Sequence, residues 1–199
     1  MRASDHVLAR LAEIGIDTAF VLYGGAMAEM ADALARQSRI RYVVCQHEQA
    51  AAFSAEGYAK VRGHPGLVIT TSGPGVGNIV TGLQNAFYDS VPLIAISGQV
   101  ARKLMRPKGS TLRQLGFQET PAAEICRPIT KYAVTVEGPE HLRHSLETAI
   151  IEATTGRPGP VLLDIPSDVQ AMEMPPTLGA VGSELKIRIP PEYLVRSEK

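Results

Sequence analysis

Tryptophan is absent from this 199-residue chain, and aromatic residues make up only 5% of it. So few rings leave little material for stacking nucleic-acid bases. Lysine and arginine together number 20, as do aspartate and glutamate, so no net charge attracts nucleic acid or an anionic membrane. We therefore expect no nucleic acid and no membrane among the partners of this protein.

Cysteine is also scarce. Cys45 and Cys126 lie in different segments without CxxC spacing, which argues against a disulfide framework and against a zinc site. No apolar signal region follows Met1, and no apolar run is long enough to span a bilayer. These absences favour a cytoplasmic protein, and the length suits one α/β domain with a sizeable core.

Short apolar runs alternate with helical segments along most of the chain. Strands are expected at residues 18–22, 42–45, 67–71, 93–97, 129–136 and 161–165. Helices are expected from a cap at Ser4 or Asp5 to Gly15, at 27–36, 47–62, 76–88 and 119–126, and from Gly138-Pro139 onward. This alternation predicts a doubly wound, six-stranded parallel sheet with helices on both faces. The run 42–45 should be buried on both faces.

The C-terminal part has a different character. Beyond Pro166 the pattern dissolves, and Pro175-Pro176 and Pro190-Pro191 are typical of a linker. We expect one domain over residues 1–170 and a linker or tail over 171–199. Residues 98–118 form a long segment without a clear period that carries five basic residues, and a loop of this length is usually functional or mobile.

Two segments that follow predicted strands indicate a site. Glu48 comes just after the strand at 42–45, and Thr71-Ser72-Gly73-Pro74-Gly75 ends the strand at 67–71. Carboxyl ends of parallel strands meet at one edge of the sheet, where open α/β sheets bind ligands. From position alone, Glu48 could equally be a first-turn carboxylate stabilised by the helix dipole. The glycine loop lacks the lysine of a P-loop and the spacing of a dinucleotide site.

An ordered set of motifs resembles a known domain. In order, the motifs are Gly24-Gly25-Ala26, His47-Glu48-Gln49-Ala50-Ala51-Ala52, Ala55-Glu56-Gly57-Tyr58-Ala59, Thr71-Ser72-Gly73-Pro74-Gly75, Ser97-Gly98-Gln99-Val100, Phe117-Gln118-Glu119 and Arg127-Pro128-Ile129-Thr130-Lys131. Over roughly residues 1–170, the chain resembles the pyrimidine-binding (PYR) domain of thiamine diphosphate-dependent enzymes. Within that family it is most similar to the acetohydroxyacid synthase and 2-oxo acid decarboxylase group.

The resemblance implies roles for individual residues. Glu48 would be catalytic, because the matching glutamate hydrogen-bonds N1′ of the aminopyrimidine ring and activates the cofactor. Phe117 and Gln118 would contact the substrate, with Gln118 also catalytic. The residues that would bind thiamine diphosphate are Gly24, Gly25, Ala26, Glu48, Thr71, Gly73, Pro74 and Asn78. From the sequence itself, His47 has no visible partner and is expected to be a satisfied or exposed histidine, and Glu56 is expected to make structural contacts on a helix face.

One family motif is missing. The family binds Mg²⁺ and the cofactor diphosphate through a Gly-Asp-Gly motif with later asparagines, and no Gly-Asp-Gly occurs in this chain. The resemblance therefore implies that this chain binds no metal itself. Mg²⁺ and the diphosphate would be held by a diphosphate-binding (PP) domain on another chain or a missing segment.

The resemblance implies that this chain is the pyrimidine-binding half of an enzyme acting on small 2-oxo acids. Acetolactate synthase-like carboligation is favoured, which would make the complete assembly a transferase or lyase. The alternatives are the alpha subunit of a split 2-oxo acid decarboxylase and a non-catalytic assembly or regulatory subunit. A homo- or hetero-oligomer is expected, because the helices after Glu48 and Gly75 are rich in small residues that suit close contact with a neighbouring subunit: Ala51, Ala55, Ala59, Gly77, Gly82 and Ala86.

Overall fold

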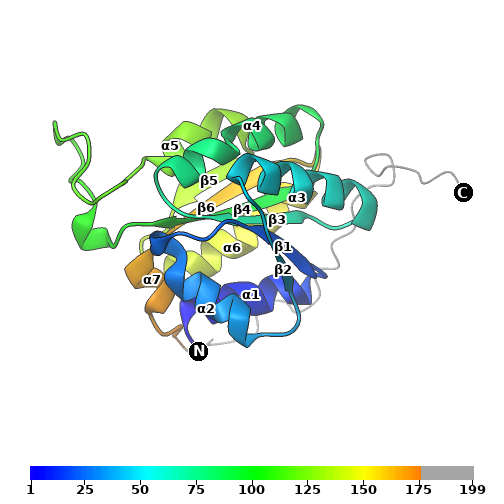
Figure 1. Cartoon of the computed structure of the whole chain (residues 1–199), viewed down its shortest axis with the longest axis horizontal. Coiled ribbons are helices and arrows are strands. Elements are labelled where there is room, and N and C mark those ends of the chain that lie inside the picture. Colours follow the sequence, from blue (N-terminus) through cyan, green and yellow to red (C-terminus); the bar gives the residue numbers. More distant parts are fainter. Residues whose placement is uncertain (176–199) are drawn as a thin grey trace, which may run out of the picture.

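A single parallel sheet forms the centre of the computed structural model, which describes residues 1–175 (Figure 1). Its strands are β1 (Thr18–Val21), β2 (Arg41–Val44), β3 (Gly66–Thr70), β4 (Leu93–Gln99), β5 (Tyr132–Thr135) and β6 (Pro160–Pro166). All pairings are parallel, and the strand order is β2-β1-β3-β4-β6-β5. The predicted six-stranded α/β fold is confirmed.

Helices cover both faces of this sheet. One face carries α1 (Ala3–Glu13), α2 (Ala28–Arg36), α6 (Pro139–Thr154) and α7 (Ser167–Ala171), and the other carries α3 (Glu48–Arg62), α4 (Pro74–Tyr88) and α5 (Ala122–Cys126). Short 3₁₀ turns lie at η1 (Gly25–Met27), η2 (Arg102–Leu104) and η3 (Arg127–Ile129). No helix within residues 1–175 has the length and apolar character needed to cross a membrane.

Central strands are buried on both sides because their side chains alternate between two cores. Leu67 and Ile69 of β3 pack into the core beneath α1, α2 and α6, whereas Val68 points to the core beneath α3 and α4. Aliphatic residues at both odd and even positions therefore suit a strand that has helices on both faces of the sheet.

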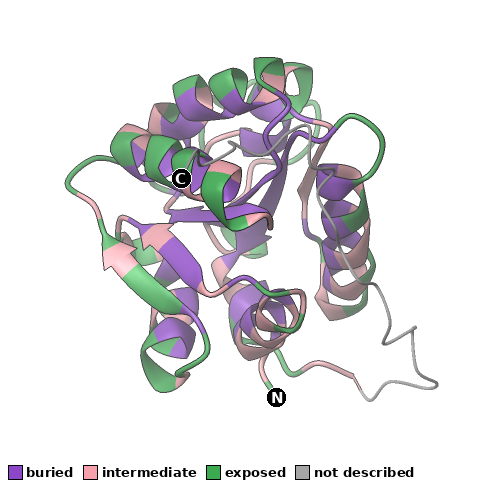
Figure 2. Ribbon diagram, turned by 90° about the vertical axis from the view of Figure 1, so that its right-hand side faces the viewer, coloured by how far each residue is buried: buried purple, intermediate pink, exposed green. Residues whose placement is uncertain are grey.

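The strand at residues 42–45 differs from the prediction. It forms β2, the edge strand, where Tyr42 is 49% and Val44 is 61% exposed (Figure 2). An edge strand has a neighbour on one side only, and here that neighbour is β1. The apolar composition of β2 therefore does not imply burial on both faces within residues 1–175.

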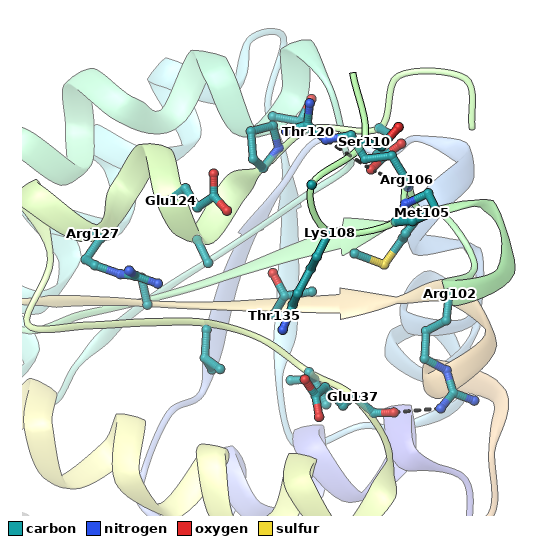
Figure 3. A pocket seen from close by; sticks show the side chains of 18 residues that line it. Arg102, Met105, Arg106, Lys108, Ser110, Thr120, Glu124, Arg127, Thr135 and Glu137 are labelled. Carbon is teal, nitrogen blue, oxygen red and sulfur yellow. Dashed lines mark hydrogen bonds and ion pairs between the residues drawn. The ribbon is translucent and has the colours of Figure 1, made fainter. Parts of the chain in front are cut away.

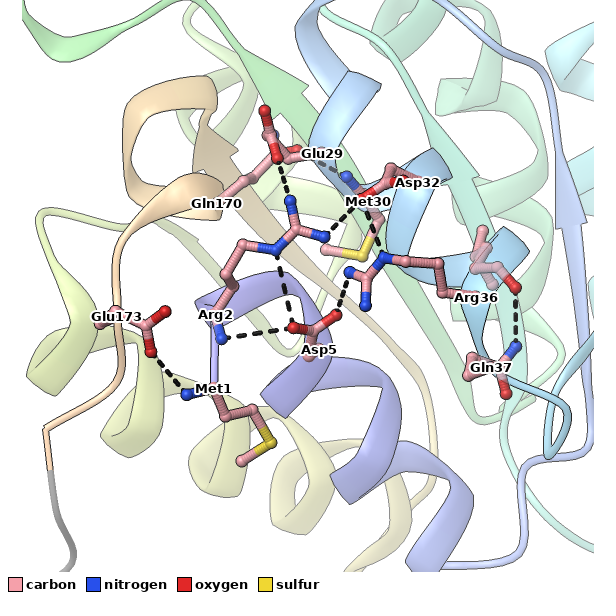
Figure 4. Close-up of polar contacts among 11 residues, drawn as sticks. Met1, Arg2, Asp5, Glu29, Met30, Asp32, Arg36, Gln37, Gln170 and Glu173 are labelled. Atoms are coloured by element: carbon pink, nitrogen blue, oxygen red, sulfur yellow. Dashed lines mark hydrogen bonds and ion pairs between the residues drawn. The ribbon is translucent and has the colours of Figure 1, made fainter.

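The first helix begins at Ala3, not after a cap at Ser4 or Asp5. Arg2 is the N-cap and has an extended backbone. Two backbone contacts hold it in this conformation: the Ala3 amide donates to Met172 O (2.8 Å), and Arg2 forms an isolated antiparallel β-bridge with Glu173. The Arg2 guanidinium also contacts carboxylates of α2, at 2.7 Å for Glu29 (Figure 4).

A short helix follows β6 where the sequence pattern dissolves. In α7, Gln170 donates to Ile165 O at 2.8 Å and accepts from the Met30 amide at 3.3 Å. The chain then remains in contact with the N-terminus as far as Met174, whose amide donates to Met1 O. The predicted linker or tail lies mostly at residues 176–199, outside the described residues. Several boundaries also shift: α4 begins at Pro74, β4 extends to Gln99, α5 begins at Ala122, and η3 precedes β5.

The small residues of α3 and α4 serve a different contact from the one predicted. Ala51, Ala55, Ala59 and Ala86 are at most 1% exposed within this single chain, and Gly82 is buried too. A Cβ placed on Gly82 would lie 2.4 Å from Ala52 Cβ. These residues therefore allow α3 and α4 to pack against each other, and only Gly77 of the predicted set is exposed.

We expect Gly82→Ala to lower the free energy of unfolding by about 1–3 kcal/mol, because its Cβ would collide with Ala52. Gly77→Ala is the matched control on the same helix. A Cβ there meets nothing within 4 Å, so this change should stabilise by about 0.5–1 kcal/mol through helix propensity alone. Urea unfolding of the three proteins measures both effects, and equal stability of the two variants would contradict this packing.

Candidate functional site

The order of the strands reverses between β1 and β3, since β2 lies outside β1 and β4 lies beyond β3. Such a reversal opens a crevice at the carboxyl ends of the strands, where α/β proteins bind ligands. Three predicted segments lie at this edge: the turn Gly24–Ala26 after β1, the loop Thr71–Gly75 after β3, and the start of α3 after β2.

Two of these segments are in direct contact. A Cβ on Gly24 would lie 2.4 Å from Thr71 Cγ2 and 2.6 Å from Thr71 Oγ1. The Ala26 amide donates to the same hydroxyl at 3.3 Å. Glycine at 24 is therefore required for the turn after β1 to rest against the loop after β3.

Glu48 is the first residue of α3 and is only 8% exposed. His47 is the N-cap of this helix, and its Nδ1 accepts from the Gln49 amide at 3.1 Å. Glu48 Oε2 accepts from Asn78 Nδ2 of α4 at 2.9 Å. Among residues 1–175, Oε1 has no hydrogen-bond partner, so one carboxylate oxygen remains free.

The surroundings of that oxygen are narrow and glycine-lined. A Cβ on Gly75 would lie 3.6 Å from Glu48 Oε1 and 2.8 Å from Thr70 Oγ1. Thr70 Oγ1 is itself buried without a partner among the described residues. A side chain at position 75 would therefore collide with Thr70 and Thr71, and Glu48 Oε1 lies at ordinary contact distance from the same position.

Gly73 and Gln118 are also brought together. Gly73 has φ 64° and ψ −126°, a conformation that favours glycine. Its Cβ would lie 2.7 Å from Gln118 Cβ, so the loop at 118 rests on the backbone of Gly73. Phe117 is 81% exposed and has its side chain in solvent.

The remaining predicted residues have less defined contacts. Pro74 is exposed at the first turn of α4, and Gly25 is exposed with open space around it. Glu56 is structural, as expected: it is 3% exposed, accepts from Asn85 at 2.8 Å and pairs with Lys60 at 2.7 Å.

Sequence reasoning missed Asp164, a fully buried carboxylate at the carboxyl end of β6. It accepts hydrogen bonds from Ser97 Oγ (2.7 Å), Gln99 Nε2 (3.1 Å) and Thr135 Oγ1 (3.0 Å). Burial raises the pKa of Asp164 to about 6, although these three bonds favour the charged form. The one signal was a lone acidic residue in the aliphatic run Val161-Leu162-Leu163-Asp164-Ile165.

Gln170 was missed together with α7. Its Nε2 donates to Ala26 O at 2.8 Å, and this bond holds the turn after β1 against α7. The Ala26 carbonyl also lies close to Gly98 of β4. A side chain at Gly98 would exclude it, because a Cβ there would lie 2.2 Å from Ala26 O. The missed helix therefore helps to position a predicted site residue.

A cavity of about 640 Å³ lies apart from Glu48, between the loop after β4 and strand β5 (Figure 3). Lys108 points into it toward Thr135, and Arg127 and Glu124 line another side. Four cations and three carboxylates line it in all. None of the predicted site residues is among the lining residues, so this cavity is separate from the crevice at β1 and β3.

Comparison with known proteins gives a consistent result. A family model described as "Thiamine pyrophosphate enzyme, N-terminal TPP binding domain" matches residues 1–125. The chloroplastic acetolactate synthase of Arabidopsis thaliana is 46% identical over 169 residues, which cover 85% of this chain and 24% of the relative. The acetolactate synthase large subunit of Corynebacterium glutamicum is 39% identical over 186 residues, covering 92% and 29%. The chain thus spans about a quarter of the length of the curated relatives it matches.

The raised pKa of Asp164 predicts a pH dependence of stability. Between its ordinary value of 3.8 and about 6, the folded chain holds a proton that the unfolded chain releases. The contribution of this group is therefore full below pH 3.8 and is lost as the pH rises through 6. A shift of this size corresponds to a fall of about 3 kcal/mol in the free energy of unfolding.

Asp164→Asn carries no titrating proton and should lack this fall. Urea unfolding of both proteins between pH 4 and pH 7 tests it, because carboxylates common to both proteins cancel in the difference. Parallel pH profiles would contradict the assignment.

Proposed function

Because this chain belongs to the thiamine pyrophosphate enzyme family, as its N-terminal TPP binding domain, we propose that it is the pyrimidine-binding half of an acetolactate synthase-like enzyme acting on small 2-oxo acids. The names of the matched relatives favour carboligation over simple decarboxylation. The proposal makes the complete assembly a transferase or lyase. From the sequence features, we also propose that the domain comprises residues 1–170 and that the protein is cytoplasmic.

The observation that carries this proposal is the state of Glu48. Its carboxylate is buried, Asn78 fixes one oxygen, and the other oxygen lies free beside Gly75. That arrangement suits a hydrogen bond to a ring nitrogen such as N1′ of an aminopyrimidine. A buried carboxyl at this position can hold or release a proton at N1′.

The other residues at the crevice fit a flat ring system. We propose that the backbone of Gly24, Gly25, Ala26, Thr71, Gly73 and Pro74, together with the side chain of Asn78, lines the pyrimidine site. Glycine at 24 and 75 permits close approach, because a side chain at either position would collide with Thr71. When bound, thiamine diphosphate supplies the electron sink that reactions of 2-oxo acids need.

Two residues of the loop before α5 are candidates for substrate contact. Phe117 is exposed and Gln118 rests on Gly73, so we propose that both face the substrate and that Gln118 takes part in catalysis. Mg²⁺ and the diphosphate belong to a diphosphate-binding domain outside this chain. That domain is supplied by another chain or a further segment, in a homo- or hetero-oligomer.

We expect Glu48→Gln to slow cofactor activation by about 10²–10⁴-fold in the complete assembly, because glutamine keeps the shape but cannot exchange a proton with N1′. The measurement is hydrogen–deuterium exchange at C2 of bound thiamine diphosphate. Glu56→Gln is the matched control, since Glu56 is also buried on the same helix but is bonded to Asn85 and Lys60. C2 exchange at the wild-type rate in Glu48→Gln would remove the role proposed for Glu48.

The 199-residue chain alone should bind thiamine diphosphate weakly and should not decarboxylate 2-oxo acids in the presence of magnesium. The reason is that this chain provides contacts to the pyrimidine and none of the Gly-Asp-Gly motif for the diphosphate. Calorimetric titration with and without Mg²⁺ tests this. Tight, magnesium-dependent binding would show that the diphosphate site is present in this chain.

A further inference from the structure

We propose that Asp164 is a positioning residue for the contact between Gln118 and Gly73, and that it acts through Gln99 and the backbone of Thr120. The functional meaning of this link rests on the proposed substrate role of Gln118. Its physical basis is a continuous set of contacts that runs from the buried end of β6 to the loop over the crevice.

The first step is the orientation of Gln99 by the carboxylate. Gln99 is 1% exposed at the end of β4, and its Nε2 donates to Asp164 Oδ2 at 3.1 Å. An ionised carboxylate only accepts hydrogen bonds, so Gln99 must present its amide nitrogen to it. The Gln99 oxygen is thereby turned toward the Val100 amide, from which it accepts at 2.9 Å.

The second step carries this orientation into the loop. The same Gln99 Nε2 donates to Thr120 O at 2.6 Å, across 21 residues of sequence. If the amide were reversed, an oxygen would face both Asp164 and the Thr120 carbonyl, and neither contact could form. The carboxylate therefore favours the orientation in which Gln99 holds Thr120 and in which the Gln99 oxygen accepts from Val100.

The last step leads from Thr120 to the crevice. Thr120 Oγ1 lies 3.4 Å from Gln118 O, to which it donates, and Gln118 Cβ rests against the Gly73 backbone. The neighbouring Leu115 and Phe117 are 50% and 81% exposed, so apolar burial does little to hold this segment. The polar anchor at Gln99 ties this loop to the end of β4, while Gly116 and the Glu119 carboxylate tie it to residues 104–106.

The other two partners of Asp164 provide a built-in control. Ser97 and Thr135 also donate to the carboxylate, but they lie on strands β4 and β5, and within residues 1–175 their side chains form no hydrogen bond with the 114–120 segment. If Asp164 were only structural, amide exchange in the 114–120 segment would change by the same amount on the loss of any one of its three donors. A positioning carboxylate affects the loop only through Gln99.

The test uses amide hydrogen exchange in the ¹⁵N-labelled chain, followed by NMR without cofactor. Gln99→Met keeps the length and burial of the side chain but loses both bonds from Nε2. We expect the Gln118 and Glu119 amides to exchange about tenfold faster, as for the loss of one ordinary to strong hydrogen bond. Amides within β4 report global opening and serve as the internal reference. Thr135→Val keeps the shape of the side chain but loses its hydrogen bond to the same carboxylate, and it should leave the Gln118 and Glu119 rates unchanged.

Asp164→Leu tests the carboxylate itself. It should reproduce the faster loop exchange of Gln99→Met, and the double variant should be no faster than either single variant, because both changes break one chain of contacts. Unchanged loop exchange in Gln99→Met, equal acceleration in Thr135→Val, or additive effects in the double variant would each overturn the proposal. If Asp164→Leu fails to fold, Asp164→Asn takes its place because it keeps the shape of the side chain, and loop exchange at the wild-type rate in that variant would overturn the proposal.

These measurements need no thiamine diphosphate, so they separate this proposal from the proposed function. A failure to bind cofactor with an intact effect on the loop would count against the function alone. An unchanged loop in a cofactor-binding chain would count against the link through Asp164 alone.

Discussion

The close approach of α3 and α4 is the constraint on which the crevice depends. Gly82 and Ala52 meet where any larger pair would collide. Asn78 and Glu48 lie one helical turn earlier on the same faces, four residues before Gly82 and Ala52. The Asn78–Glu48 hydrogen bond therefore forms only at the helix separation that this small contact permits. On the far side of the contact, Asn85 bonds Glu56 in the same manner.

A second anchor lies at the opposite end of the same sheet edge. Asp164 joins the ends of β4, β5 and β6 through three donors, and Gln99 extends this network to the loop before α5. The two anchors meet at the loop after β3, because Gly73 contacts Gln118 while Gly75 borders Glu48. The position of one glycine loop thus depends on helix packing on one side and on a buried carboxylate on the other.

What the sequence predicted well is what local pattern determines. Runs of consecutive aliphatic residues identified the strands. The position directly after a strand placed Glu48 and the loop at 71–75 at one edge of the sheet. Local pattern does not say which strand lies at an edge, so Tyr42 and Val44 were expected to be buried. It also does not name the partner of a small residue, so Ala55 and Gly82 were assigned to a subunit contact. The helix α7 and the role of Asp164 depend on partners far along the chain, such as Met30 and Ser97, which no local window contains.

Two glutamates of α3 show how similar residues come to differ in chemistry. Both are buried, and both accept from an asparagine of α4. Glu56 has both oxygens bonded to Asn85 and a lysine at 2.7 Å, so its charge is fully compensated within the chain. Glu48 has one bonded oxygen and no ion-pair partner within residues 1–175, and its second oxygen lies beside Gly75. A buried carboxylate left half-satisfied is costly to a fold unless a ligand completes its hydrogen bonding, which is the physical reason to regard Glu48, rather than Glu56, as the functional group.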